Sequence, residues 1–296
     1  MHKKSNTIIL TALDFSPCAI NALEYAIKSH ADYNAKIVLV HAIQNKYFET
    51  FINKLIDKKK SKTKINIDKK FESILKNKME YLNLNFEYEI ITEFGSPLEI
   101  ILKTIRKVKP FILIVGAKKT TTFIQKFFKN DTIKLIEQAK CPVIIVPEGV
   151  KYKKIERITF ATDYKASDIM SIKNLTEQAK PFNIKIQIIH IAEGEYSKEF
   201  EEIMLKDFLY RVNKKTTYKE ISYKLIEAEN IDTIIKNQLT HKQTDLFSLS
   251  TSLHYGWLSK IVESKISKIL KQSKVPIMAY HYKKTKDELY SQQLSD

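Results

Sequence analysis

The sequence predicts an α/β protein of two tandem, doubly wound units, each with a five-stranded parallel sheet (strand order 3-2-1-4-5) flanked by helices. Three observations lead to this prediction. The chain has 296 residues, enough for two ordinary domains. It repeats its own patterns, and its short apolar runs alternate with helix-like segments. Runs such as FILIVG and CPVIIVP are β-branched and bounded by glycine or proline, which favours buried parallel strands over an all-helical protein.

Internal repeats point to a duplicated unit. TIILTALDFS resembles RITFATDYKA, KIVLVHAI resembles KIQIIHIA, and KLIEQAKCPVIIVP resembles KILKQSKVPIMAYH. The spacing of 27 residues from Asp14 to His41 recurs from Asp163 to His190. Because residue types and spacing recur together, we expect each unit to be one copy of the same fold.

The boundary between the copies is expected in the stretch PEGVKYKK. This stretch combines proline, glycine and several lysines, a composition typical of a segment between domains. It gives a first unit of residues 1–150 and a second unit of residues 151–296. The second unit ends in the polar sequence KKTKDELYSQQLSD, which predicts a frayed tail.

The first unit shows its elements most clearly. Ser16 followed by Pro17 predicts a helix start, with a capping hydroxyl before a proline at the first helical position. GSPLEIILKTIRKVKP predicts a second capped helix, which Pro110 ends. Further helices are expected within residues 47–84 and at residues 132–139. Strands are expected at residues 8–13, 37–40, 86–92, 111–115 and 143–146.

The net charge of +16 would suit a protein that binds nucleic acid or an anionic membrane. Only three of the 50 basic residues are arginines, and proteins that read base edges depend on arginine. Lysine-coated, solvated surfaces explain the charge without such a partner. Nucleic acid and membrane are therefore disfavoured as main partners, and a basic-surface function is kept as an alternative.

The cysteine content and the hydropathy of the chain indicate its cellular compartment. Cys18 and Cys141 are too few for a disulfide framework and are not spaced as metal ligands. No apolar run approaches the roughly 18 residues that a membrane-spanning helix needs, and the N-terminal apolar run reads as a first strand. We therefore expect a cytoplasmic protein without a metal site.

A binding site in this fold is expected at the carboxyl ends of the strands, where the strand order reverses. Strands one and four border that crevice. Asp14 follows the first strand and Gly116 ends the fourth, so both should face the same opening. Asp14 has a competing interpretation as a cap for its loop or for the helix that starts near Ser16.

The segments ILTALDFSPCAINALEYA, IVLVHA, ILIVGAKK and NDTIKLIEQAKCPVIIVP resemble the universal stress protein family. The resemblance covers nearly the whole chain as two tandem copies and is clearest in the first. It implies a five-stranded parallel α/β fold, in agreement with the pattern above. It also implies a function in stress adaptation and, in some members, nucleotide binding.

Nucleotide-binding members of this family resemble one another in a loop of the form G-x2-G-x9-G-[ST], whose N–H groups hold phosphates. In the first unit the loop positions are Gly116, Lys119, Lys129 and Asn130. One glycine of three therefore remains, and the lysines supply positive charge for a rebuilt anion site. The resemblance assigns contacts with the rest of the nucleotide to Ala12, Asp14 and Ala42.

In the second unit the same loop has decayed further. Its glycine and hydroxyl positions are Ser250, Leu253, Glu263 and Ser264, and the counterparts of Asp14 and Ala42 are Asp163 and Ile191. A side chain in place of glycine blocks the approach of phosphate or strains the backbone. Glu263 adds a negative charge, so this site is expected to be degenerate.

These observations predict a tandem universal-stress-type protein that binds or interacts without catalysis and has impaired ATP binding. One alternative is an ATP-binding stress sensor that uses the first unit alone; others are a slow nucleotide hydrolase and a basic-surface binder of nucleic acid or anionic membrane. The fifth strands end each sheet, and the resemblance implies that the two units pair through them with pseudo-twofold symmetry. A homodimer is a further option.

Overall fold

The structure is a computed structural model that describes residues 7–44, 53–118, 131–192, 194, 196–227, 231–240, 242–251 and 273–281. The chain divides into two compact units. The first contains Met1–Ala117 and Gln138–Tyr152, and the second contains Lys118–Glu137 and Lys153–Asp296. Most of helix α5 (Asp131–Gln138) thus groups with the second unit.

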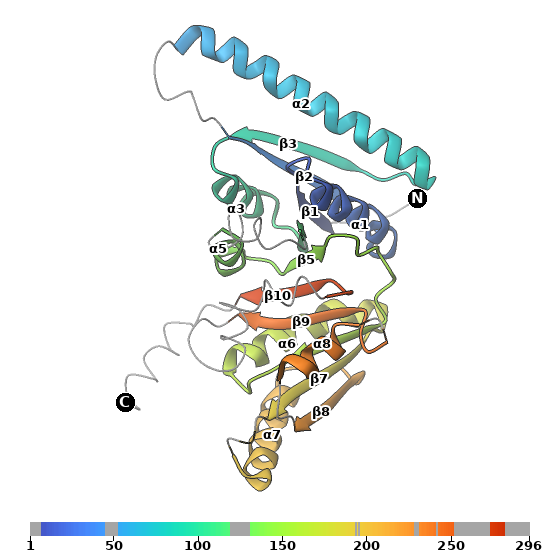
Figure 1. Cartoon of the computed structure of the whole chain (residues 1–296), viewed down its shortest axis with the longest axis vertical. Coiled ribbons are helices and arrows are strands. Elements are labelled where there is room, and N and C mark those ends of the chain that lie inside the picture. Colours follow the sequence, from blue (N-terminus) through green and yellow to red (C-terminus); the bar gives the residue numbers. More distant parts are fainter. Residues whose placement is uncertain are drawn as a thin grey trace. The chain divides into compact units, whose positions relative to one another are not determined.

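The sheet of the first unit has the predicted strand order. All its strands run parallel, in the order β3-β2-β1-β4-β5 (Figure 1). The strands are β1 (Ile8–Ala12), β2 (Lys36–Ile43), β3 (Tyr88–Phe94), β4 (Ile112–Ala117) and β5 (Val143–Pro147). Their apolar residues are buried in β4, β5 and the middle of β1 and β2, as expected for a parallel sheet covered on both faces, whereas the edge strand β3 is partly exposed.

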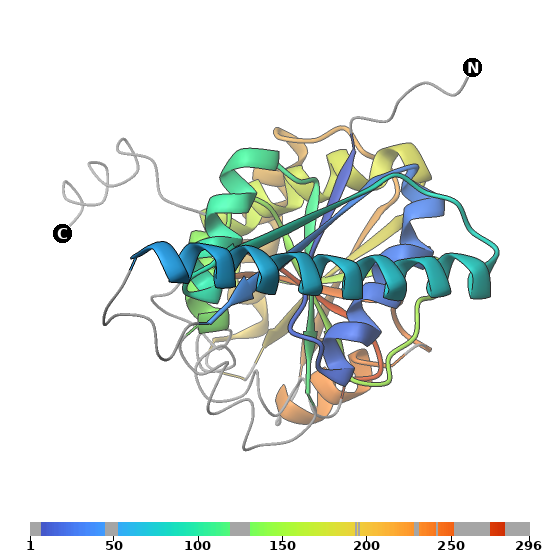
Figure 2. The same cartoon turned by 90° about the horizontal axis from the view of Figure 1, so that it is seen from above.

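The helices of the first unit begin where their capping residues predict. Helix α1 (Pro17–Tyr33) starts after Ser16, whose side chain accepts a hydrogen bond from Ala19 N, and it ends at Asn34 in a left-handed conformation. Helix α3 (Pro97–Val108) follows Ser96 and stops two residues before Pro110. Helix α2 (Asn53–Leu82) lies across the strands in Figure 2.

One core of the first unit lies between the sheet and helices α1 and α2. Leu23 and Ile27 of α1, Ile37 and Leu39 of β2, and Phe71 of α2 are almost fully buried there. The α2 residues in this core lie between Ile67 and Leu82. In contrast, the described side chains from Ser61 to Asn66 are all exposed.

The second unit repeats the architecture. Its parallel strands follow the order β8-β7-β6-β9-β10, which is the predicted order of the copy. They are β6 (Arg157–Ala161), β7 (Lys185–Ala192), β8 (Ile221–Glu227), β9 (Leu246–Thr251) and β10 (Ile277–His281). The helices are α6 (Ala166–Ala179), the short 3-10 helix η2 (Lys180–Phe182), α7 (Lys198–Asn213) and α8 (Ile231–Gln238).

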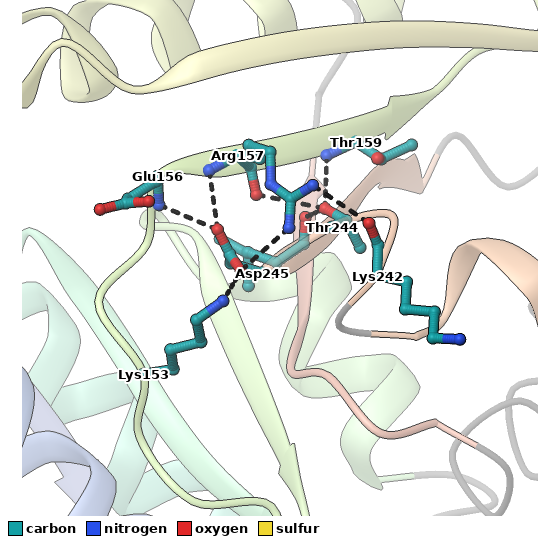
Figure 3. Close-up of polar contacts among 8 residues, drawn as sticks. Lys153, Glu156, Arg157, Thr159, Lys242, Thr244 and Asp245 are labelled. Carbon is teal, nitrogen blue, oxygen red and sulfur yellow. Dashed lines mark hydrogen bonds and ion pairs between the residues drawn. The ribbon is translucent and has the colours of Figure 1, made fainter.

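A buried carboxylate secures the strand starts of the second unit (Figure 3). Asp245 accepts hydrogen bonds from the backbone N–H groups of Glu156 and Arg157 and pairs with Lys153 Nζ at 2.9 Å. Burial opposes its ionisation, but these donors prevail and lower the pKa of Asp245. Thr244, which donates to Leu246 O and accepts from Thr159 N, completes the arrangement.

None of the described helices has a stretch long and apolar enough to cross a bilayer.

Candidate functional site

The predicted crevice of the first unit lies at the carboxyl ends of β1 and β4, which are neighbours in the sheet. Ala12 is the last residue of β1, and Gly116 lies near the end of β4. Asp14 follows β1 with an exposed side chain, and Ala42 is half-buried near the end of β2. Lys119, Lys129 and Asn130 lie outside the described residues, so their assignment to a nucleotide stays a prediction.

Asp14 takes part in the loop that leads into helix α1. Its carboxylate accepts hydrogen bonds from the backbone N–H of Ser16, at 2.9 Å, and from the Ser16 hydroxyl. The Ser16 hydroxyl in turn accepts from Ala19 N at 3.3 Å. This geometry matches the capping interpretation, in which the carboxylate fixes the residue that caps the helix.

Phe15 and His41 form a supporting layer under this loop. Phe15 has a φ of 61°, which is uncommon for a residue with a side chain, and its ring stacks on Phe71 of α2 with 4.4 Å between centroids. The His41 ring lies 5.2 Å from Phe15, and its Nδ1 donates to Leu13 O at 2.6 Å. These contacts give the histidine a structural role at the strand end.

The start of helix α1 lies in close contact with the sheet at Gly116. A Cβ placed on this glycine would lie 2.1 Å from Cys18 O and 2.8 Å from Ala19 N. Real Cβ atoms do not come this close to backbone atoms, so the helix start and a side chain cannot share the space. The packing of α1 therefore requires this glycine, a role that the sequence pattern alone does not reveal.

The equivalent crevice of the second unit is arranged differently. Asp163 follows β6, and its side chain is only 6% exposed, with Oδ2 at 3.4 Å from Lys165 Nζ. Ser250 stands in β9 at the place of Gly116 and is buried, and in the described part of the chain its hydroxyl has no hydrogen-bond partner. Ile191 is also buried. Glu263 and Ser264 fall among the residues that the structure does not describe.

Asp168 lies beside the crevice of the second unit and was not predicted from the sequence. Its carboxylate is almost fully buried and accepts hydrogen bonds from Thr162 Oγ1 at 2.8 Å, Asp163 N at 3.0 Å and Lys165 N at 3.3 Å. Burial raises the pKa of this carboxyl to about 6. The signal lay in the sequence: an acidic residue in the first helical turn can bond back to the residue before the helix. The counterpart of Asp168 in the first unit is Ala19.

His190 repeats the placement of His41 with one addition. Its Nδ1 donates to Thr162 O at 2.8 Å, and its ring stacks on Tyr164 with 4.0 Å between centroids. Glu201 of α7 places Oε2 at 3.5 Å from His190 Nε2. Glu201 is buried, and no local pattern indicates this pair, because the two residues lie on different elements.

The described residues hold no group of three or more His, Cys, Asp or Glu side chains that would suit a metal ion. Cys18 is buried at the start of α1. Burial raises the pKa of the half-buried Cys141 thiol to about 12, so this thiol is a poor nucleophile. The site thus consists of capped loops at strand ends.

Comparison with known proteins identifies the fold. Residues 5–147 match the model of the Universal stress protein family, whereas no curated protein matches the chain. A universal stress protein from Archaeoglobus fulgidus DSM 4304 has a similar structure, with a TM-score of 0.63, 16% identity and coverage of 96% of this chain and 98% of that one. A functionally unknown protein from Pseudomonas aeruginosa PAO1 matches with a TM-score of 0.52, 10% identity and coverage of 97% and 96%.

Both structures match this chain over nearly its full length, as expected for a protein with two copies of the fold. At these identities the matches support the fold alone. The assignment to a family depends on the match of residues 5–147, which contain the capped loop and the five-stranded sheet of the first unit. The first half of the chain therefore belongs to the universal stress protein family, and the second half repeats its strand order in tandem.

Proposed function

We propose that this chain is a non-catalytic binding protein of stress adaptation, located in the cytoplasm, in which ATP binding is impaired in both units. The observation that carries the proposal is the Asp168 carboxylate. It occupies the N–H groups of Asp163 and Lys165 at the mouth of the second crevice. A nucleotide brought to this opening would find those donors already used and a carboxyl nearby.

The second unit fits a nucleotide poorly for two further reasons. Ser250 puts a side chain where the first unit has bare backbone, and close approach to phosphate depends on bare backbone. The side chain of Asp163 is covered and paired with Lys165, whereas the counterpart Asp14 is exposed. These features support impaired ATP binding in the second unit.

The first unit retains Gly116, but this does not require a nucleotide. The close packing of helix α1 accounts for this glycine by itself. Two features favour the alternative of an ATP sensor in the first unit alone: Asp14 is exposed at the opening, and Lys118 follows β4 with a half-buried side chain. If ATP binds there, Asp14 would face the sugar and base, and Lys118 would lie towards the phosphates.

Two measurements test the proposal. Mass spectrometry of the purified full-length protein would reveal a nucleotide that copurifies, and we expect none. Thermal unfolding with and without ATP should give the same melting temperature. If ATP did bind, a concentration of 100 times its Kd would add about 2.7 kcal/mol to the free energy of unfolding and raise that temperature. A shift that Lys118→Glu removes, and that Lys109→Glu at the opposite end of β4 leaves unchanged, would instead support the first-unit sensor.

Catalysis is tested separately from binding. The described residues offer no metal cluster, and the two histidines at the strand ends are engaged by carbonyl groups. We therefore expect no release of phosphate from ATP above that of a buffer control. Release that Asp14→Asn abolishes would support a slow hydrolase.

The basic-surface alternative rests on helix α2. Lys62, Lys64 and Lys69 are exposed on this helix. Retention on DNA or on anionic vesicles that weakens with salt would support it, and loss of retention on changing these three residues to glutamate would assign it to α2. Pairing of the two units through β5 and β10 stays a prediction from the sequence.

A further inference from the structure

We propose that the outer face of helix α7 is a self-association surface, on which a second copy of this chain docks with its own α7 running antiparallel. This inference does not depend on the nucleotide proposal. It rests on an apolar stripe that the fold leaves exposed and on charges that complement one another under a twofold axis.

The stripe consists of large apolar side chains at helical spacing. The stripe contains Tyr196, just before the helix, and Phe200, Ile203 and Tyr210, which share one face of α7 because they are three and seven residues apart. Their exposed fractions are 59%, 44%, 61% and 60%. Tyr196 precedes the helix and contacts Phe200, with 5.0 Å between ring centroids.

This exposure is unusual for the chain. Eight large hydrophobic side chains are exposed among the described residues, and four of them lie on this single face. Scattered exposed hydrophobics are normal, whereas a contiguous row marks an interaction surface. The opposite face of α7 is already used, because Phe208 and Val212 are fully buried in the second unit.

The first unit offers a direct contrast. Helix α2 occupies the same place in its unit as α7, and its described side chains include two exposed large hydrophobic residues, Ile65 and Tyr81, which lie sixteen positions apart. No row of apolar groups continues from Ile65, since Lys62, Lys69 and Glu72 share its face. The apolar stripe is thus a property of the second unit and not of the fold.

The charges beside the stripe indicate a second copy as the occupant. Glu199 and Glu202 lie on one flank before Ile203, and Lys206 lies on the same flank after it. All three are exposed. In an antiparallel pair with a twofold axis at Ile203, the two glutamates of each copy face Lys206 of the other. A parallel pair would instead place this flank against the opposite flank of the other copy, where these charges do not meet.

The twofold axis also matches the apolar residues. Ile203 lies midway between Tyr196 and Tyr210, so it would meet its own copy at the axis. Each Tyr196 would then lie beside Tyr210 of the other chain. Aromatic residues around a central aliphatic contact are typical of the centre of a protein interface.

Sedimentation velocity over a range of concentrations tests the association. We expect a monomer–dimer equilibrium that Ile203→Glu weakens by at least about tenfold, the loss expected for a central interface residue. Ile65→Glu on helix α2 is the matched control and should leave the equilibrium unchanged. A wild-type chain that stays monomeric, or a dimer that Ile203→Glu leaves intact, would overturn the proposal.

Charge variants test the orientation without altering the apolar stripe. Lys206→Glu should weaken the dimer, because both copies then present only acidic groups on this flank. Combining it with Glu199→Lys and Glu202→Lys restores opposite charges and should restore association. Failure of the triple variant to recover, in a protein with an unchanged circular dichroism spectrum, would contradict the antiparallel arrangement.

Cross-linking locates the axis. In a background with Cys18→Ala and Cys141→Ala, Ile203→Cys should form an intermolecular disulfide under oxidation. Tyr210→Cys should not, because an antiparallel pair separates these positions by about 21 Å along the helix. Efficient cross-linking through residue 210 would indicate a parallel pair. If only a chain ending after His281 dimerises, its own tail is the occupant, and the proposal fails.

Discussion

The two units use the same strand order, yet the loop between the first strand and the first helix is held differently in each. In the first unit Ser16 caps helix α1, Ala19 follows, and Gly116 lets the helix lie against the sheet. In the second unit the corresponding residues are Lys165, Asp168 and Ser250. Instead of a serine that caps a helix N–H group, the buried carboxylate of Asp168 bonds back to Lys165 N before the helix and to Thr162 after the strand. The same fold thus accommodates either an apolar residue, Ala19, or a buried carboxylate, Asp168, in the first turn of this helix.

The largest expected effect comes from filling the space at Gly116. Gly116→Ala should lower the free energy of unfolding by about 3 kcal/mol or more, because the new Cβ meets the backbone of Cys18 and Ala19. Urea denaturation followed by circular dichroism measures this change. A loss below about 1 kcal/mol would mean that helix α1 can move away at little cost.

Asp168 should give the second unit a pH dependence that the first unit lacks. Because burial raises its pKa to about 6 in the folded state, its contribution favours folding at low pH and is lost as the pH rises from about 4 to about 6. Relative to Asp168→Asn, the wild-type unfolding free energy should fall by up to about 3 kcal/mol across this window.

The measurement is urea denaturation of both proteins at several pH values between 4 and 7. Asn retains one oxygen acceptor and the shape of the side chain, so the difference between the two curves isolates the ionisation of Asp168. A difference that stays flat with pH, or that rises with it, would contradict this account of the buried carboxyl.

A smaller effect is expected at Asp14. Asp14→Ala removes the acceptor for Ser16 N and for the Ser16 hydroxyl, which should cost about 1 kcal/mol, the usual worth of a cap interaction. Thermal unfolding without any nucleotide detects it. An unchanged stability would indicate that Asp14 serves a ligand and not the loop.

The smallest effect is expected at Ser250, the counterpart of Gly116. Its buried hydroxyl has no partner in the described part of the chain, so Ser250→Ala removes a desolvated polar group and should change stability by less than about 0.5 kcal/mol or increase it. Paired with Gly116→Ala, this variant tests whether the two crevices differ as described. A loss as large as that of Gly116→Ala would show that they do not.

The sequence predicted the fold well because its signals are local and repeated. The Ser-Pro cap of α1, the continuous apolar strands and the matched spacings each indicate their element without knowledge of the other parts. The interpretation of Gly116 was incomplete for the opposite reason. Its contact with Cys18 joins residues nearly a hundred positions apart, and a loop pattern carries no information on such packing.

The same limit explains the other residues that were missed. The pairing of His190 with Glu201 and the hydrogen bonds of Asp245 join separate elements, so spacing along the chain does not reveal them. Asp168 differs, because an acidic residue in the first turn of a helix is a local signal that the pattern TDYKASD contains. Attention to capping in the second copy would have found it.

Isothermal titration of ATP into the full-length protein tests the central claim most directly. Because the loops at the strand ends of the two units are held by their own hydrogen bonds, we expect no saturable heat of ATP binding. One site per chain, abolished by Lys118→Glu, would contradict impaired binding in the first unit, and two sites per chain would contradict the assignment of Asp168 and Ser250 as barriers to the nucleotide.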